Sequence, residues 1–300
     1  GTYYMGMNDF GHGGGLFLNE TSGNFDEIKI YNNSAAMNGG GIWSSFSSEW
    51  TLTNSDVSDN YAPTVGGGLA FWGTTSGERP VFENVTVNNN TSQGDGGAVF
   101  GTDSHPIFVN CTFNNNTSGF RGGGAYFNGG SYLEFQNCGI IGNSANIGGG
   151  VMVEGQASFW MNKTLVTGNT ANQSVGAIGL GSSGEKYITN STISENNGPN
   201  AGGVQIWNGD VAVVNSILWN NTPANDYMNV GGGTAAAIYS TIGGGWDGDG
   251  NLDTDPLFKD PYNGDFTLSQ DSPCRDAGIA DWDGDGVEDV TDYNGSAPDM

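Results

Sequence analysis

Short stretches in which apolar and polar residues alternate run through most of the chain. Residues 108–113 (Phe-Val-Asn-Cys-Thr-Phe) and 85–87 (Val-Thr-Val) are typical examples. Alternation with a period of two, carried by β-branched and aromatic residues, predicts β-strands. The 3.6-residue period of an amphipathic helix is absent, and the many glycines disfavour helices as well. We therefore expect an all-β chain of short strands.

Two landmarks repeat along the chain at nearly constant spacing. The first is a block of glycines followed by apolar residues. The last glycines of these blocks are Gly15, Gly41, Gly68, Gly97, Gly124, Gly150, Gly176 and Gly203. The second is an asparagine three positions after an apolar residue. These asparagines are Asn33, Asn60, Asn90, Asn116, Asn143, Asn169, Asn196 and Asn221. Two landmarks that stay in step over all of these units establish an internal repeat.

The repeat predicts a parallel β-solenoid of about 8–10 coils, each of about 26–27 residues. Gly and Asn suit the corners because both tolerate left-handed backbone angles. Asparagines at one position of successive coils are expected to form a hydrogen-bonded ladder. With about 4.8 Å per coil, the rod is on the order of 40 Å long. Residues 1–245 are expected to form the repeats, and residues 246–300 an irregular acidic segment that closes the same continuous domain.

The paired landmarks resemble the repeats of the polymorphic outer-membrane-protein family of bacterial surface adhesins. Residues 96–99 (Gly-Gly-Ala-Val) and 113–116 (Phe-Asn-Asn-Asn) match its two motifs best. Residues 251–258, 263–268 and 272–278 are similar to the closing segment of many secreted bacterial right-handed β-helix proteins, in which a sorting or anchoring domain commonly follows. Together the resemblances imply a right-handed parallel β-helix outside the cell or on the bacterial surface, within a larger polypeptide or assembly.

Charge narrows the range of partners. Lys plus Arg is 7 and Asp plus Glu is 32, so the formal net charge is −25. Nucleic acid is not expected as a partner, because phosphate binding needs clustered Lys and Arg. Insertion into a membrane is not expected either, because no run of about 18 apolar residues occurs. The first residues lack the pattern of a signal peptide, which is expected of a mature or excised piece.

Near the C-terminus, acidic residues follow the spacing of a calcium loop. The expected ligands are Asp281, Asp283, Asp285, Val287 through its carbonyl, Asp289 and Asp292. Calcium prefers six to eight oxygen ligands, and Gly286 stands where such loops turn sharply. Position 12 of the loop is Asp292, where an EF-hand has Glu, and a shorter carboxylate can bind through one oxygen. The alternative is an acidic, solvated turn.

A weaker candidate for calcium lies earlier in the closing segment. Its expected ligands are Asp247, Asp249, Asn251 and Asp253. The same residues also match the closing-segment pattern, where they could form turns only. Of the 32 acidic residues, 15 lie between Asp247 and Asp299, so negative charge is concentrated at this end.

Two of the three cysteines occupy the same place in neighbouring units. Cys111 and Cys138 lie one repeat apart, and each follows an asparagine. They should be vertical neighbours within the distance range of a disulfide. Val85 and Ser191 hold the same place in other units, which indicates a small buried position, and we favour free stacked thiols.

A catalytic role is uncertain, and the sequence favours a non-catalytic one. β-Helix lyases of acidic polysaccharides usually need Lys or Arg at the reacting carbon, and the repeat clusters none of the seven basic residues. Hydrolases need two carboxylates on either side of one bond, and no such pair recurs on one face. The alternative function is a polysaccharide-binding or lyase-like β-helix protein.

An apolar row is predicted on the outside of the rod. Counting from the last glycine of each block, positions +1 and +3 should point inward and position +2 outward. The +2 residues are Phe17, Trp43, Ala70, Val99, Tyr126, Met152, Ile178 and Gln205. Position +4 adds Trp72, Asn128, Leu180 and Trp207. Exposed apolar patches often mark interaction sites.

The predicted ligand-binding face consists of Phe17, Trp43, Trp72, Tyr126 and Trp207, and its partner would be a glycan or a surface protein. The alternative is that a neighbouring domain or the loops between strands cover this row. The loop at residues 74–78 is a further candidate for contacts. The sequence thus favours a structural or adhesive surface module with calcium at its acidic end.

Overall fold

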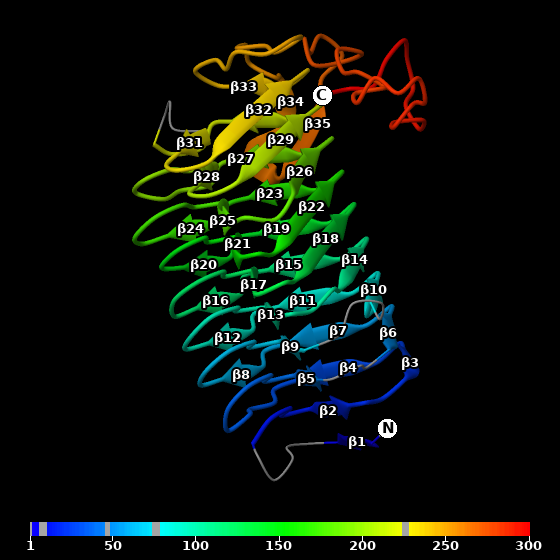
Figure 1. Ribbon diagram of the computed structural model, residues 1–300, viewed down its shortest axis with the longest axis vertical. Coiled ribbons are helices and arrows are strands. Elements are labelled where there is room, and N and C mark those ends of the chain that lie inside the picture. The colour runs from blue at the N-terminus through cyan, green and yellow to red at the C-terminus, as the bar shows by residue number, and fades with distance from the viewer. Residues whose placement is uncertain (1, 6–10, 46–48, 74–78, 224–227) are drawn as a thin grey trace.

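The computed structural model describes residues 2–5, 11–45, 49–73, 79–223 and 228–300, so the candidate loop at residues 74–78 lies outside the described residues. The chain winds into a parallel β-solenoid whose coils stack along the long axis, with the N-terminus at one end and the closing segment at the other (Figure 1). Within the repeats, each strand pairs in parallel with the equivalent strand of a neighbouring coil. The predicted all-β solenoid is confirmed.

Two of the long sheets are built from the first and second strands of successive coils. Sheet A consists of β1 (Thr2–Met5), β2 (Leu16–Asn19), β5 (Ile42–Ser45), β9 (Leu69–Trp72), β13 (Val99–Thr102), β17 (Ala125–Asn128), β21 (Val151–Gly155), β25 (Ile178–Ser182), β28 (Val204–Ile206) and β31 (Met228–Val230). Sheet B consists of β3 (Gly23–Asp26), β6 (Trp50–Thr53), β10 (Val81–Glu83), β14 (Ile107–Val109), β18 (Tyr132–Gln136), β22 (Ser158–Asn162), β26 (Lys186–Thr189), β29 (Asp210–Val214) and β32 (Thr234–Ile238).

A third long sheet and a shorter one complete the coils. Sheet C consists of β4 (Lys29–Tyr31), β7 (Asp56–Ser58), β11 (Thr86–Asn88), β15 (Thr112–Asn114), β19 (Gly139–Ile141), β23 (Leu165–Thr167), β27 (Thr192–Ser194), β30 (Ile217–Trp219) and β33 (Thr241–Ile242). Sheet D consists of β8 (Tyr61–Ala62), β12 (Thr91–Ser92), β16 (Thr117–Ser118), β20 (Ser144–Ala145) and β24 (Thr170–Ala171).

The predicted asparagine ladder is present along its whole length. The amide of Asn116 donates to Asn143 Oδ1 at 2.9 Å, and the backbone N–H of Asn116 donates to the same oxygen at 2.9 Å. The same bonds link the other neighbours from Asn33 to Asn221. Each amide from Asn60 onward also donates to a backbone carbonyl of the preceding coil, as Asn143 does to Phe113. The buried turn is therefore satisfied without water.

The corners between sheets B and C use left-handed backbone angles, as predicted for asparagine. Asn110, Asn137 and Asn190 have φ of 53°, 52° and 49°. The glycine blocks need glycine for a different reason, because the backbones of neighbouring coils approach each other closely there. A Cβ on Gly41 would lie 2.7 Å from the carbonyl oxygen of Gly68 in the next coil.

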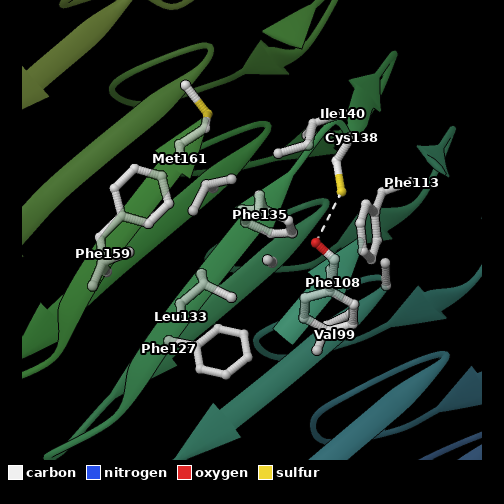
Figure 2. Close-up of a cluster of buried hydrophobic side chains, with 14 of the residues drawn as sticks. Val99, Phe108, Phe113, Phe127, Leu133, Phe135, Cys138, Ile140, Phe159 and Met161 are labelled. Carbon is white, nitrogen blue, oxygen red and sulfur yellow. Dashed lines mark hydrogen bonds between the residues drawn. The ribbon is translucent and has the colours of Figure 1, made fainter. Parts of the chain in front are cut away.

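Inward side chains of sheets A, B and C fill one continuous core. Aromatic rings stack from coil to coil, with ring centroids of Phe82 and Phe108 4.8 Å apart and of Phe108 and Phe135 5.4 Å apart. Figure 2 shows this part of the core, where Cys138 lies beside Phe113. The Cys138 thiol donates to the backbone carbonyl of Phe108. The coils stabilise one another because each buries its apolar side chains against the next.

The two ends of the rod depart from the repeat. At the N-terminal end β1 pairs with β2 in the antiparallel sense. At the other end Leu252 bridges to Thr241, and a hairpin follows, built from β34 (Phe258–Asp260), the 3-10 helix η1 (Pro261–Asn263) and β35 (Asp265–Leu268). Residues of the closing segment pack on a second small core around Ile217, Cys274 and Met300.

Candidate functional site

The predicted face outside sheet A is not an exposed stripe. Trp43 is 7% and Tyr126 1% exposed, and Phe17 and Trp207 are half-buried against the same cluster. Of the five residues, Trp72 alone is exposed, at 43%. The expectation of an open aromatic face there is therefore wrong for most of its length. The ligand-binding role of these residues stays a prediction.

Two residues that the sequence predicts at the outward +2 position point inward instead. Val99 pairs with Leu69, and Ile178 pairs with Val151, so both belong to the inward row. The reason is that Ala98 and Ala177 take the place of the last glycine of the block in their coils. Counting from the glycine itself shifts the assignment by one residue, which reverses the facing of a strand. The outward residues in these coils are Phe100 and Gly179.

The outer row of sheet A buries itself. The Trp72 ring lies between those of Trp43 and Phe100, with centroid distances of 5.9 and 5.8 Å, over the small Ala70. Trp207 fills the equivalent gap outside Gly179. Val65 and Ile147, which directly precede the glycine blocks, pack against the row from the side. This row therefore forms a second, outer core.

An ion-pair network covers the middle of that row. The Arg121 guanidinium lies 4.5 Å from the centroid of the Tyr126 ring and pairs with Asp95 at 2.9 Å and with Glu154. The Tyr126 hydroxyl donates to Glu154 at 2.8 Å. Burial, followed by the bond to Glu154, raises the pKa of Tyr126 well above its ordinary value. The network stabilises this outer core rather than leaving it open to a ligand.

A second aromatic row, outside sheet B, is partly exposed. Trp160 and Tyr187 occupy equivalent positions in adjacent coils, with ring centroids 4.7 Å apart. Tyr132 lies 6.1 Å from Trp160 at one end, and Trp282 of the closing segment lies 5.8 Å from Tyr187 at the other. Trp160 is 39% exposed. The sequence interpretation missed this row, although Trp160 and Tyr187 lie one repeat apart.

A groove of about 270 Å³ runs beside this second row. Its floor is the outer face of sheet B, where Gln136 and Asn162 lie next to the aromatic side chains, and its other wall is formed by the closing segment with Trp282 and Asp289. The lining residues include no lysine or arginine within the described part of the chain. The groove therefore combines exposed aromatic surface with amides and carboxylates.

Hydrogen bonds and an ion pair attach the last part of the closing segment to the side of the rod. Residues 278–292, which we call the strap, begin where Asn215 exchanges two hydrogen bonds with the backbone of Ile279, at 2.8 and 2.9 Å. Further along, the Lys163 amine pairs with both carboxylate oxygens of Asp292. This bond lowers the pKa of Asp292. The strap is what closes the groove on the side away from sheet B.

Lys163 stands where neighbouring coils have asparagine. Its φ is 51°, close to that of Asn137 and Asn190, although lysine has little preference for this left-handed conformation. A non-glycine residue held in such a conformation is a reason to look for a function. Here the side chain reaches Asp292 of the strap.

Part of the predicted calcium loop gathers in the structure. One oxygen from each of Asp281, Asp283 and Asp285 lies within 4.8 Å of the others, and these are the single such group of His, Cys, Asp or Glu in the described ranges. Gly284 and Gly286 turn the loop with φ of 76° and 88°. Three carboxylates around one point, with no basic group among them, fit a hard divalent cation.

The other predicted ligands of this loop lie elsewhere. Asp289 accepts the backbone N–H of Trp282 at 3.0 Å, and Asp292 is paired with Lys163. Val287 is 68% exposed. Asp292 thus connects the loop to the rod, a role that the EF-hand spacing did not predict.

The weaker calcium candidate has a structural role at the end of the rod. Asn251 accepts the N–H of Ser240 at 3.0 Å and donates to the carbonyl of Ala237 at 2.8 Å. Asp253 accepts the N–H of Gly244 at 2.9 Å. Asp247 and Asp249 do not gather with them into a group of ligand atoms within the described residues. These residues cap the last coil, and their role as calcium ligands stays a prediction.

The two stacked cysteines are free and buried, as predicted. They lie in adjacent coils, where the N–H of Gly139 donates to the carbonyl of Cys111 at 2.9 Å. Their thiols point to backbone carbonyls of the core, those of Phe82 and Phe108, each at 3.4 Å. They serve as small core residues.

The family model described as the right handed beta helix region matches residues 6–171. This is more than half of the chain, which therefore belongs to the right-handed β-helix family. No curated protein and no solved structure matches it. In the described ranges, no helix combines the length and the apolar character needed to cross a bilayer. The family establishes the fold and leaves the activity open.

Proposed function

We propose that this chain is a non-catalytic module of a secreted or cell-surface bacterial protein, which holds a binding face rigidly within a larger polypeptide or assembly. The observation that carries the proposal is the unbroken asparagine ladder from Asn33 to Asn221, together with the strap that fixes the acidic end. Such a rod keeps surface side chains at set positions over many coils. Its partner would be a glycan or another surface protein.

We further propose that calcium stabilises the acidic end through Asp281, Asp283 and Asp285. Bound calcium would offset two of the three negative charges of the gathered carboxylates and hold the loop that carries Trp282 and is attached through Asp292. A ligand that binds the folded state alone raises its stability by about 2.7 kcal/mol at a concentration of 100 times Kd.

The test is thermal melting with calcium and with chelator. Chelation should lower the Tm of the full chain by about 5 °C, and Asp283→Asn should remove most of that difference. Asp271→Asn, which removes an exposed carboxylate of the closing segment outside both candidate loops, is the matched control and should respond to calcium as the unaltered chain does. Equal melting with calcium and chelator would contradict calcium binding.

A second candidate function is cleavage of a polysaccharide. The observation in its favour is the groove beside sheet B, whose lining includes the carboxylates of Glu134 and Asp289. Incubation with neutral and acidic polysaccharides, followed by measurement of new reducing ends and of unsaturated products, separates cleavage from binding. New reducing ends or unsaturated products would show that the chain is an enzyme and not a display module.

A further inference from the structure

We propose that the groove between sheet B and the strap binds an uncharged polysaccharide, which lies along the rod axis with its sugar rings against Trp160, Tyr187 and Trp282. This inference rests on the proposed display function and names its binding face and ligand. The face differs from the one outside sheet A that the sequence predicts. It combines a partly exposed aromatic row, adjacent polar groups and an absence of basic lining residues in the described part of the chain.

The aromatic row runs along the rod rather than around it. Trp160 and Tyr187 are register partners in adjacent strands, so their separation follows the stacking of the coils. Trp282 continues the row from the strap, and Trp160 is 39% exposed. A row of aromatic rings at nearly regular intervals is complementary to a polymer with a repeating apolar ring face, since aromatic side chains combine a large apolar surface with a polar edge.

Polar side chains beside the row are already oriented. Asn162 Oδ1 accepts the Thr189 hydroxyl at 3.1 Å and the Asn190 amide at 2.8 Å. Gln136, one coil before Asn162, is exposed and donates to Glu134. Amides and hydroxyls held in place offer both donors and acceptors to sugar hydroxyl groups, and a few oriented polar groups within an aromatic lining are typical of ligand sites.

The charges around the groove favour an uncharged ligand. Glu134 is neutralised by Arg79, whose guanidinium lies 2.6 Å from its carboxylate and 4.5 Å from the centroid of the Tyr132 ring. Asp289 remains as an acidic lining residue. A polyuronate would meet this carboxylate, without a lining lysine or arginine, on a chain of net charge −25. Repulsion between like charges therefore excludes acidic polysaccharides from the expected ligands.

The experiment is native affinity electrophoresis of the full chain in gels that contain hydroxyethylcellulose, glucomannan, dextran or polygalacturonate. We expect retardation by at least one of the three neutral polymers and none by polygalacturonate. Trp160→Ala should weaken that binding roughly tenfold or more, because truncation of a central aromatic contact carries much of a binding energy. Trp282→Ala should weaken it as well.

The matched control is Trp72→Ala, which removes a tryptophan of similar exposure from the outer face of sheet A. It should leave the retardation unchanged, and melting curves of the three variants show that each is folded. Retardation by none of the neutral polymers, preference for polygalacturonate, or a loss with Trp72→Ala in place of Trp160→Ala would each overturn the proposal. A binding loss in Trp160→Ala with an unchanged response to chelator separates this site from the proposed calcium effect.

Discussion

The outer faces of sheets A and B both carry a row of aromatic side chains, yet the row of sheet A is mostly buried, with Trp72 exposed, and the row of sheet B is partly exposed. On sheet A, Tyr126 is 1% exposed and Phe100 4%. On sheet B, Trp160 is 39% exposed beside a groove. An aromatic residue at an outward position of a β-helix is therefore not by itself a sign of a binding face.

The difference arises from what lies beside each row. Sheet A follows the glycine blocks, and the residues before these blocks, such as Val65, Arg121 and Ile147, fold over its outer face. The strap lies over the row of sheet B and leaves a groove between itself and Trp160. The outer row of sheet A adds stability, and the row of sheet B is available for contacts.

The sharpest test of this comparison is truncation of one aromatic residue in each row. Phe100→Ala should lower the free energy of unfolding by about 3–5 kcal/mol, because it opens a cavity between Trp72 and Tyr126. Trp160→Ala should change it by less than about 1 kcal/mol, since the side chain lies outside the core and is partly solvated. Urea denaturation of both variants gives the two values, and equal losses would remove the distinction between the rows.

The next largest change in the free energy of unfolding is expected when the arginine that lies over each row is removed. Arg121→Ala should cost about 1–2 kcal/mol, because it uncovers Tyr126 and leaves two carboxylates unpaired at a site that is only partly solvated. Arg79→Ala, which removes the arginine over Tyr132, is the matched variant and should cost less than about 1 kcal/mol. Urea midpoints that fall in the opposite order would mean that sheet B holds the more important outer contacts.

A smaller change in stability is expected for Lys163→Asn, which tests the wall of the groove. Asparagine accepts the left-handed corner, so the Tm should change by no more than about 2 °C. The strap loses its bond to Asp292, and hydrogen exchange at residues 279–292 should become faster while exchange in sheet A stays the same. Unchanged protection of the strap would show that Lys163 does not hold it.

Low pH should weaken the bond between Lys163 and Asp292 in the unaltered chain and loosen the strap, as Lys163→Asn should do. The bond to Lys163 lowers the pKa of Asp292 in the folded state. A lowered carboxylate pKa contributes stability above the ordinary value of 3.8, and this contribution is lost as the pH falls through the lowered value. The protection of the strap from exchange, taken relative to the intrinsic rate at each pH, should therefore fall as the pH drops below 3.8 in the unaltered chain and change less in Lys163→Asn.

The smallest effect is a difference in tyrosine titration between the rows. Burial, then the charge of Glu134, raises the pKa of Tyr132 to about 12, and burial with Glu154 raises that of Tyr126 further. A raised tyrosine pKa means that stability present below the ordinary value of 10.0 is lost as the pH rises through the raised one. Ultraviolet titration should lose a component near pH 12 in Tyr132→Phe. Titration of Tyr126 at the ordinary value would contradict its burial.

Much of the fold could be predicted because the repeat places equivalent residues one coil apart. The ladder through Asn116 and Asn143 and the placement of Cys111 and Cys138 in adjacent coils follow from spacing alone. The facing of Val99 and Ile178 was wrong because an alanine replaced the glycine used as a reference. A one-residue error is enough to exchange the two faces of a strand.

The candidate sites were predicted less completely. The spacing of carboxylates identified Asp281, Asp283 and Asp285 as a group, since these lie close together in the chain. Their relation to the rod could not be derived, because Lys163 and Asp292 lie far apart in the sequence and no repeat connects them. The groove depends on that relation, since Trp282 reaches Tyr187 only when the strap lies against sheet B.

The sequence by itself determined the winding, the ladders and the core, because a repeat of one unit makes every coil a copy of its neighbour and the contacts between coils follow from the spacing. The tertiary structure alone decided which outer row is buried and which lies in a groove. Those faces are covered by turns and by the strap, whose paths depend on individual contacts such as Arg121 with Glu154 and Lys163 with Asp292. Contacts between segments that do not repeat carry no periodic pattern in the chain.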